Sequence, residues 1–248
     1  MNTSAPITLI TGASKGIGRA CALMFAEQKH ELILVARDGE KLAEVTEACK
    51  NFGAIAHYFV TDLSDSQSVV QLFKNIQCLL ANRPLSNAIH CAGQMRDAML
   101  SMTRVNDVES LLTINVAASI QICQLVSRLM IRYKTGHLLL VSSKVAEVGS
   151  PGQSVYAATK GAISSFVKSL AKELGPIGIR VNAISPGFIE TDLTAHYSSQ
   201  KKEQLKESIS LRRLGQAEDV ASVAKFLCSK EAAYVTGHIM SVDGGLSL

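Results

Sequence analysis

Residues 7–20 read ITLITGASKGIGRA, and this stretch decides the fold of the chain. An apolar run of strand length leads into a turn with three glycines, and a pattern with helical spacing follows. Gly12 permits the sharp bend, Gly16 lets the backbone approach a pyrophosphate, and Gly18 allows close packing of the helix. The helix N-terminus then faces the anion. The stretch therefore predicts the first strand, turn and helix of a nucleotide-binding fold.

The spacing of the turn narrows the choice of ligand. Its glycines follow G-x-x-x-G-x-G, and its lysine is not followed by the serine or threonine found in loops that cradle a transferred phosphate. We therefore predict a bound dinucleotide cofactor, with an ordinary glycine turn as the alternative. The expected contacts in the turn are Gly12, Ser14, Lys15, Gly16, Ile17 and Gly18.

Further apolar runs of strand length follow along the chain, separated by segments with helical spacing. They cover residues 32–36, 56–60, 87–91, 137–141, 180–184 and 238–242. Runs that are apolar on both faces indicate a parallel sheet covered by helices on both sides. We predict one α/β domain over residues 1–248, a Rossmann-type three-layer fold with a doubly wound parallel sheet of about seven strands.

Composition excludes several other classes of protein. The 248 residues are 47% hydrophobic and 19% charged, which is typical of a globular chain. A net charge of +4, an aromatic content of 5% and the lack of tryptophan give no sign of nucleic-acid binding. The six cysteines form no C-x-x-C pair and no zinc spacing, so we predict reduced thiols and no metal.

The expected location is the cytoplasm. No charged segment precedes Lys15, and no apolar stretch approaches the roughly 18 residues of a membrane-spanning helix. An organelle such as the mitochondrion stays open as an alternative.

Local signals predict two helix starts and one unusual segment. Asp38 suits the N-cap of one helix, and Ser64 with Gln67 suits a capping box for another, whose inward positions are Val70, Phe73 and Ile76. Residues 191–213 are polar and charged and follow a predicted strand. We expect a substrate lid around residues 188–213, with a solvated surface helix as the alternative.

The end of the second predicted strand bears on the choice of cofactor. An acid at this place favours NAD, whereas an arginine accommodates the 2′-phosphate of NADP. Arg37 and Asp38 are both present, but Asp38 has a competing role as a helix cap. Arg37 and Lys15 together can hold a doubly charged phosphate. We therefore predict NADP(H).

A tyrosine and a lysine share one face of a predicted helix. Tyr156 and Lys160 are four residues apart, which places them about 6 Å apart along the helix axis. At an effective dielectric of about 20, an ammonium about 5 Å from a phenol stabilises the phenolate by roughly 3 kcal/mol. We expect the pKa of Tyr156 to move from about 10 toward about 8, where a proton donor works well near neutrality. An ordinary helical pair is the alternative.

Together these motifs resemble those of the short-chain dehydrogenases/reductases over essentially the full chain. In order, they are residues 11–18, Asp62, Asn115, Ser143, Tyr156-x-x-x-Lys160, Pro186-Gly187 and residues 242–245. Residues 185–193 and 213–220 are most similar to 3-oxoacyl-[acyl-carrier-protein] reductases, although reductases of other ketones share these phrases.

The resemblance implies a role for each matching residue. Tyr156 would protonate a carbonyl oxygen as hydride arrives, and Ser143 would hydrogen-bond the same oxygen. Lys160 would lower the pKa of Tyr156 and hold the nicotinamide ribose, and Asn115 would position a water that relays protons to Lys160. The further cofactor contacts it implies are Asp62, Leu63, Cys91, Ala92, Gly93, Pro186, Gly187, Ile189 and Thr191.

One position departs from the family pattern. The family usually has Asn-Asn-Ala-Gly or Asn-Ala-Ala-Gly where this chain has His90-Cys91-Ala92-Gly93. A thiol is a poor replacement for an amide that both donates and accepts hydrogen bonds. We expect cofactor binding to survive with lower stability or affinity. We also expect Cys91 to be packed rather than redox-active, and His90 to be satisfied in the core rather than catalytic.

The resemblance favours NADPH-dependent reduction of a 3-oxoacyl thioester, carried on acyl carrier protein in fatty acid synthesis. A reductase of another ketone or alcohol (sugar, steroid or xenobiotic carbonyl) and a nucleotide-binding relative without turnover are the alternatives. An acidic carrier requires cations beside the active-site mouth, and the resemblance favours Lys134, although cations at a helix end also offset the helix dipole. The candidates are Arg128, Arg132, Lys134, Lys201, Lys202, Lys206, Arg212 and Arg213.

The family is commonly tetrameric, and the resemblance therefore implies a homotetramer. The helix after Tyr156 would take part in the subunit contacts. Its apolar positions Ile163, Phe166 and Leu170 are compatible with a subunit contact and equally with the core of one chain.

Overall fold

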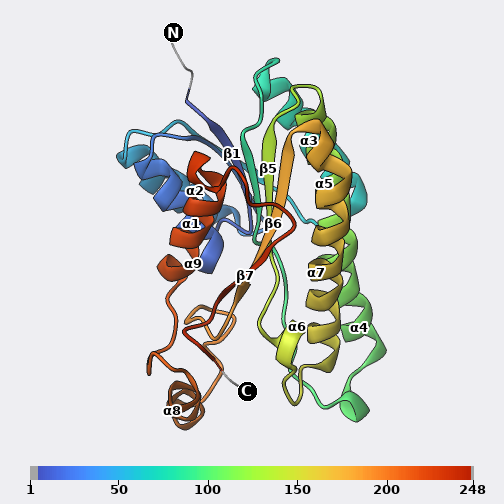
Figure 1. The fold of residues 1–248 in the computed structure, drawn as a ribbon, viewed down its shortest axis with the longest axis vertical. Helices are drawn as coiled ribbons and strands as arrows, with labels where there is room; N and C mark the ends of the chain where they lie inside the picture. The colour runs from blue at the N-terminus through green and yellow to red at the C-terminus, as the bar shows by residue number, and fades with distance from the viewer. Residues whose placement is uncertain (1–4, 247–248) are drawn as a thin grey trace.

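Seven parallel strands form one sheet in the computed structural model of the chain (Figure 1). The strands are β1 (Ile7–Thr11), β2 (Glu31–Ala36), β3 (Ala56–Val60), β4 (Asn87–His90), β5 (Gly136–Val141), β6 (Ile179–Pro186) and β7 (Ile239–Val242). Their order is β3-β2-β1-β4-β5-β6-β7, so the strand order reverses between β1 and β4. The structure describes residues 5–246, and residues 1–4 and 247–248 of the predicted domain lie outside them. The predicted doubly wound sheet is confirmed.

Helices cover both faces of this sheet. They are α1 (Gly16–Glu27), α2 (Gly39–Asn51), α3 (Ser66–Leu80), α4 (Val105–Leu112), α5 (Ala118–Ile131), α6 (Val145–Val148), α7 (Ser154–Leu174), α8 (Ser199–Ser208) and α9 (Ala217–Cys228). Figure 1 shows α1, α2 and α9 on one face and α3, α5 and α7 on the other. Each face buries its own apolar cluster against the sheet. This is the predicted three-layer arrangement.

The strands differ in how far both of their faces are buried. Every residue of β1 and β2 is buried, as expected for apolar runs inside a parallel sheet. In β3, Tyr58 and Val60 are 46% and 57% exposed. Because β3 lies at the edge of the sheet, it has a neighbouring strand on one side only, and its two faces are not fully covered.

One predicted helix start is confirmed and one is wrong. Asp38 caps α2 by accepting a hydrogen bond from the Lys41 N–H at 3.1 Å. The N-cap of α3 is Asp65 rather than Ser64, and its carboxylate accepts from the N–H groups of Gln67 and Ser68 at 3.1 and 3.2 Å. The predicted inward set is therefore wrong in one position, since the helix buries Val69, Phe73 and Ile76 and leaves Val70 exposed.

One helix is longer and more apolar than the sequence led us to expect. The turns of α4 and α5 run on through residues 113–117 as one helix, Val105–Ile131, which by length and composition alone could cross a membrane. The expectation that no apolar stretch approaches that length is therefore wrong. One such helix is weak support for a membrane span, because core helices pass the same test. Here Ala118, Ile122 and Val126 are buried in the core.

The histidine at the end of β4 is buried in the core with a hydrogen-bond partner for each ring nitrogen, as predicted. His90 is 6% exposed, and its Nδ1 lies 2.8 Å from the Thr11 hydroxyl. Its Nε2 lies 2.9 Å from the Ser119 hydroxyl. Burial lowers the pKa of His90 to about 3, so the ring is neutral. The ring thereby joins β1, β4 and α5 beside the carboxyl end of the sheet.

Candidate active site

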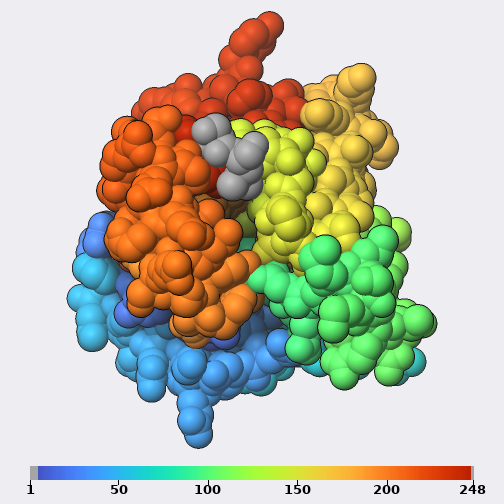
Figure 2. All heavy atoms as spheres, turned by 90° about the horizontal axis from the view of Figure 1, so that it is seen from below, coloured from blue at the N-terminus to red at the C-terminus, as the bar shows by residue number. Residues whose placement is uncertain are grey.

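A cavity of about 670 Å³ opens at the carboxyl ends of the strands, where the strand order reverses. This is the place at which open parallel sheets bind their ligands. Figure 2 looks at this end of the molecule, and a hollow lies between the orange segment after β6 and the segments after β4 and β5. The cavity is lined by residues from all of these segments and from the glycine turn.

The structure gathers nearly all of the predicted site residues around this cavity. Those that line it are Gly12, Ser14, Lys15, Gly16, Ile17, Gly18, Arg37, Leu63, Cys91, Ala92, Gly93, Ser143, Tyr156, Lys160, Pro186, Gly187, Ile189 and Thr191. Asp62 and Asn115 are not in the lining. Instead, Asn115 is 1% exposed and lies behind the wall formed by Gly93.

The geometry of the glycine turn fits a bound pyrophosphate. A Cβ on Gly12, whose φ is +67°, would lie 2.8 Å from the Ala92 backbone nitrogen. A Cβ on Gly18 would lie 2.2 Å from the Gly12 carbonyl oxygen. Within residues 5–246, no side chain caps the N-terminus of α1. Its first N–H groups are therefore free to meet an anion, and the backbone around the turn is too close for side chains.

The residues predicted to select NADP lie at one wall of the cavity. Arg37 is exposed there, next to the end of β2. The carboxylate of Asp38 is committed to the N-cap of α2. The Nζ of Lys15 lies 3.4 Å from a carboxylate oxygen of Asp192 in the predicted lid. A phosphate at this wall would therefore meet Arg37 directly and compete with Asp192 for Lys15.

Asp62 follows β3 and is held by its own loop. Its Oδ1 accepts from the N–H of Ser64 at 2.9 Å and from the Ser64 hydroxyl at 2.7 Å. These two hydrogen bonds lower the pKa of Asp62, so the carboxylate stays ionised. The adenine contact that the resemblance implies for Asp62 stays a prediction.

Tyr156 and Lys160 lie one turn apart on α7, as predicted, but their electrostatics differ from the prediction. The Lys160 Nζ is 5.8 Å from the centre of the Tyr156 ring, and it donates to the Val141 carbonyl at 2.7 Å. Burial lowers the pKa of Lys160 to about 8. Burial also raises the pKa of Tyr156 to about 12, and the hydrogen bond with Ser143 offsets only part of this rise.

The expected lowering of the Tyr156 pKa toward 8 is therefore wrong for this structure. The phenolate would lose its water on burial, and the ammonium that should stabilise it is turned to a carbonyl and is itself easily deprotonated. The phenol consequently holds its proton over the whole neutral range. Such a phenol always carries its proton when a carbonyl oxygen arrives, but it is a weaker acid than the phenol with a pKa near 8 that the sequence predicts.

Asn115 holds the loop after β4 against α7. It lies where the helix loosens to a π turn, Thr113–Ala117, a distortion that is frequent at functional sites. Its Oδ1 accepts from the Gln94 N–H at 2.8 Å, and its Nδ2 donates to the Gln94 carbonyl at 2.9 Å. Nδ2 also lies 3.1 Å from the hydroxyl of Thr159, the residue before Lys160. The water-positioning role of Asn115 stays a prediction.

Cys91 takes the place of the family's asparagine without leaving a gap. It is partly buried, lines the cavity and packs against the apolar cluster that contains Cys21. A hydrogen bond with Cys91, together with burial, raises the pKa of the Cys21 thiol well above its ordinary value. This packing agrees with the expectation that Cys91 is a packed residue.

Asp97, Gln153 and Tyr197 are among the lining residues that the sequence did not indicate as site residues. The Gln153 Nε2 donates to Asp97 Oδ1 at 2.9 Å and lies 3.1 Å from the Tyr197 hydroxyl. Gln153 precedes Tyr156 by three residues, a helical spacing that was available as a signal. No local pattern indicates Asp97 or Tyr197, because they meet across 100 residues of sequence.

The predicted lid segment forms one wall of the cavity. Phe188, Tyr197 and Leu205 line the cavity, and Ile189 pairs with Gly215 as an isolated bridge. Within this segment α8 buries none of its own residues, as a solvated surface helix would. The segment thus combines both alternatives, and its opening and closing as a lid stays a prediction.

The basic groups predicted to dock a carrier lie at two opposite ends of the sheet. Lys134 follows α5 and precedes the amino end of β5, whereas the cavity meets the carboxyl end of β5 at Val141. A strand of this length spans about 20 Å. The expectation that Lys134 and its neighbours Arg128 and Arg132 lie beside the mouth is therefore wrong within one chain. Lys201, by contrast, lines the cavity.

The remaining candidates for docking lie around the predicted lid and already have partners. Lys202 lies 3.8 Å from Glu190, Lys206 lies 2.6 Å from Glu203, and Arg213 lies 2.6 Å from Asp219. The Arg212 guanidinium donates to the Glu207 carbonyl. Lys201 is thus the best placed of the candidates to meet an acidic partner at the mouth.

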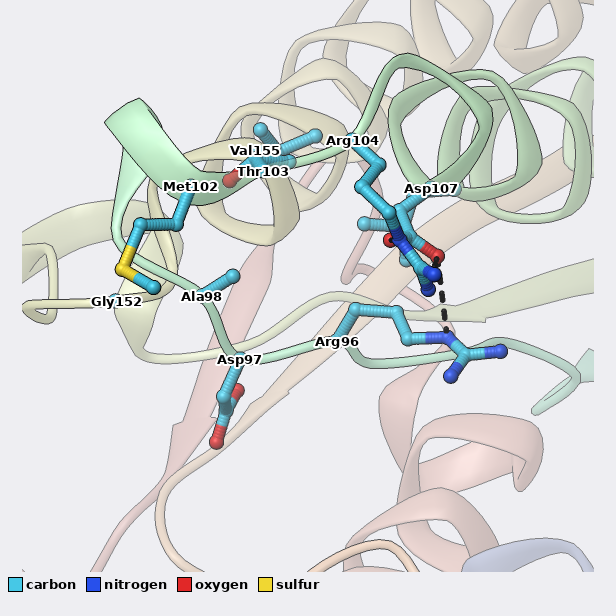
Figure 3. Close-up of a pocket in the computed structure, with 10 residues that line it drawn as sticks. Arg96, Asp97, Ala98, Met102, Thr103, Arg104, Asp107, Gly152 and Val155 are labelled. Atoms are coloured by element: carbon cyan, nitrogen blue, oxygen red, sulfur yellow. Dashed lines mark hydrogen bonds and ion pairs between the residues drawn. The ribbon is translucent and has the colours of Figure 1, made fainter.

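A second cavity of about 260 Å³ lies beside the first and is shown in Figure 3. Arg96 and Arg104 lie 3.9 and 2.9 Å from the Asp107 carboxylate. Asp97 borders both cavities, and in Figure 3 its side chain points away from this group of charges. In the part of the chain that is described, no three metal-binding side chains gather in one place.

Comparison with known proteins identifies relatives over nearly the whole chain. Residues 12–247 match the family described as Enoyl-(Acyl carrier protein) reductase. The chain is 37% identical over 241 residues to 3-oxoacyl-[acyl-carrier-protein] reductase FabG of Aquifex aeolicus (strain VF5), covering 97% of this chain and 96% of that one. It is 38% identical over 244 residues to carbonyl reductase family member 4 of Xenopus laevis, covering 98% of each.

Solved structures show the same fold. The structure of YwfH, described as an NADPH dependent reductase involved in bacilysin biosynthesis, superposes with a TM-score of 0.92. The two sequences are 27% identical, and the alignment covers 98% of this chain and 99% of the other.

Proposed function

This chain belongs to the short-chain dehydrogenase/reductase family, and we propose that it uses NADPH to reduce a 3-oxoacyl thioester on acyl carrier protein. Membership makes it an oxidoreductase that acts on CH–OH and C=O groups with a nicotinamide cofactor. One observation carries the proposal: Ser143, Tyr156 and Lys160 face the same cavity as the glycine turn. The product would be the 3-hydroxyacyl form, as fatty acid synthesis requires.

The chain's own residues supply the proton and the stabilisation of charge. A bound reduced nicotinamide supplies the hydride. Tyr156 holds its proton at Oη, and Ser143 lines the same cavity, so both hydroxyls can meet one carbonyl oxygen. As negative charge develops on that oxygen, Ser143 stabilises it and Tyr156 transfers its proton to it. Lys160, with a pKa of about 8, can then return a proton toward Tyr156.

NADPH rather than NADH is supported by the exposed Arg37 at the cavity wall and by the engagement of Asp38 as a cap. We expect Arg37→Ala to weaken NADPH binding by about 1.5 to 3 kcal/mol, the contribution of a charged hydrogen bond, or roughly 10- to 150-fold. NADH binding should barely change, since NADH lacks the 2′-phosphate. Fluorescence titration with each cofactor measures both affinities.

The matched control is Arg19→Ala. Arg19 is an exposed arginine of α1 that does not line the cavity, so its loss removes the same charge from outside the site. The NADPH affinity of the Arg19→Ala variant should stay within about twofold of wild type, as expected for a screened surface charge. Equal losses for NADPH and NADH in Arg37→Ala would refute the assignment of Arg37 to the 2′-phosphate.

A reductase of small free ketones is the second candidate, and the similarity to a relative named carbonyl reductase supports it. The test compares acetoacetyl groups on acyl carrier protein and on a free thioester at rising ionic strength. If an acidic carrier docks, its kcat/KM should fall steeply with salt, while that of a small neutral ketone should not. Turnover of the carrier-linked group that is no better than that of the free thioester and insensitive to salt would favour the second candidate.

Substitutions of two lysines at opposite ends of the sheet show where an acidic carrier docks. Lys201→Ala at the cavity should lower the kcat/KM for the carrier-linked substrate several-fold and leave that for the free thioester unchanged. Lys134→Asn removes the same charge at the far end, and asparagine tolerates the φ of +52° at that position. A selective loss in Lys134→Asn instead would place docking away from the mouth of the same chain.

The proposal includes a homotetramer in the cytoplasm, and both of these stay predictions. Of the apolar positions suggested for subunit contacts on α7, Ile163 and Leu170 are buried within the core of the single chain. Phe166 is partly buried against the same cluster. Ile163 and Leu170 therefore belong to the core of the single chain, and of the three only Phe166 keeps exposed surface for a subunit contact.

A further inference from the structure

Asp97 places a carboxylate in the wall of the active-site cavity. It lies in the segment after β4, four residues beyond Gly93. The same cavity is lined by Ser143 and Tyr156. The Asp97 side chain is 27% exposed, so its charge is only partly surrounded by solvent. In Figure 3 it points away from Arg96, the neighbouring cation.

Donors from two other segments fix this carboxylate. Gln153, which is 7% exposed at the start of α7, donates to Oδ1 at 2.9 Å. From the predicted lid, the Tyr197 hydroxyl donates to Oδ2, and the Nε2 of His196 lies 3.2 Å from the same oxygen. Gln153 and Tyr197 are neutral donors. They hold the carboxylate in place without removing its negative charge.

The negative charge of Asp97 raises the pKa of the proton donor, Tyr156. Burial is the main cause that raises the pKa of Tyr156, and the negative charge of Asp97 acts in the same direction. Gln153, the anchor of Asp97, lies three residues before Tyr156. A carboxylate that a substrate carries into this cavity would therefore be repelled by the charge of Asp97.

Among the described residues, no lysine or arginine that lines the cavity, Arg37 included, forms an ion pair with Asp97. Lys15 and Lys144 are committed to other carboxylates, at 3.4 Å from Asp192 and 3.0 Å from Asp243. Lys160 is buried and donates to a backbone carbonyl. Lys201 is exposed on α8, where water screens it. His196 contacts Asp97 directly, and its side chain is 55% exposed.

We infer that Asp97 is a specificity-determining residue that disfavours 3-oxo acids, whose carboxylate is one carbon away from the ketone, and admits their neutral esters and thioesters. The inference rests on the proposed function and narrows its substrate class. The reaction is the same for both classes: the carbonyl carbon takes hydride from the cofactor, which is oxidised, and the oxygen takes the proton of Tyr156. Only the charge beside the reacting carbon differs.

Acetoacetate and methyl acetoacetate test this inference because they differ mainly in that charge. The ratio of their kcat/KM values, acetoacetate over ester, is measured at saturating cofactor and low salt. We expect a low ratio in wild type and about a tenfold higher ratio in Asp97→Asn, as removal of one partly screened charge several ångströms away should give. An unchanged ratio in an Asp97→Asn variant that still reduces the ester would overturn the inference.

Two control variants separate charge from structure. Asp107→Asn removes a carboxylate of the neighbouring cavity, outside the active site, and should leave the ratio at the wild-type value. Tyr197→Phe removes one hydrogen bond to Asp97 but keeps its charge, so both rates can fall while the ratio stays low. A ratio that rises as much in either control as in Asp97→Asn would show that the charge of Asp97 is not the cause.

A measurement on the wild-type enzyme keeps the inference testable if Asp97→Asn is inactive. Salt screens the repulsion between Asp97 and acetoacetate, so the ratio should rise as ionic strength increases. A ratio that stays constant or falls with salt would contradict the inference. Failure of the proposed function looks different, because the wild-type enzyme would then reduce neither methyl acetoacetate nor an acetoacetyl thioester.

Discussion

Tyr156→Phe is expected to lower kcat by about 10²- to 10⁴-fold, the range that a positioned proton donor contributes. The substitution removes only the hydroxyl, which holds a proton in the cavity because burial raises the pKa of Tyr156 to about 12. The ring stays in place, so the cavity keeps its shape. Steady-state reduction of an acetoacetyl thioester gives kcat, and cofactor titration should show an affinity close to that of wild type.

Tyr133→Phe is the matched control for this change. Tyr133 follows α5 and Asn82 follows α3, and the Tyr133 hydroxyl donates to the Asn82 carbonyl. This contact lies far from the carboxyl ends of the strands. Its loss should leave kcat unchanged within about twofold, as for any group that contributes nothing to the transition state. If Tyr156→Phe retains more than about a tenth of the wild-type kcat, the proton must reach the substrate by another route.

Gly12→Ala is expected to lower the free energy of unfolding by roughly 2 to 5 kcal/mol and to abolish measurable cofactor binding. Two separate costs add up, because the φ of +67° is strained for any residue with a Cβ. The new carbon would also lie 2.8 Å from the Ala92 nitrogen, which is backbone and cannot turn aside. Urea denaturation measures the stability, and titration with NADPH measures the binding.

Gly161→Ala provides the contrast within the same chain. Gly161 lies inside α7, and an added Cβ would meet nothing within 4 Å. Alanine should therefore stabilise this helix by about 0.5 to 1 kcal/mol. A Gly12→Ala variant with wild-type stability and cofactor affinity would show that the turn does not need glycine there.

Most of the fold could be predicted because its strands are short, apolar and separated by helical patterns. The runs at residues 7–10 and 32–36 lie in fully buried strands, where the sequence signal is strongest. One error occurs where two neighbouring residues compete for one role. Ser64 and Asp65 both suit a helix cap, and Asp65 is the cap that α3 uses. Likewise Val69 and Val70 are neighbouring apolar residues, and only Val69 is buried.

Only the parts of the candidate site that consist of short local motifs could be predicted from the sequence. The glycine turn and the Tyr156–Lys160 pair are local, and the structure brings them to one cavity. The contact between Asp97 and Tyr197 joins residues 100 positions apart, so no periodicity could reveal it. The Tyr156 pKa was missed for a physical reason. Burial removes water from around the phenolate, and this loss outweighs the attraction of the ammonium.

The buried ring of His90 makes the chain sensitive to acid. In the native state its pKa is about 3, whereas an unfolded histidine titrates near 6.5. Between those values the unfolded chain binds a proton that the native ring refuses, so stability falls as the medium is acidified below about pH 6.5. The decline for this one group approaches about 1.4 kcal/mol per pH unit. The ring that joins β1 and β4 to α5 therefore makes the free energy of unfolding larger at neutral pH than in acid.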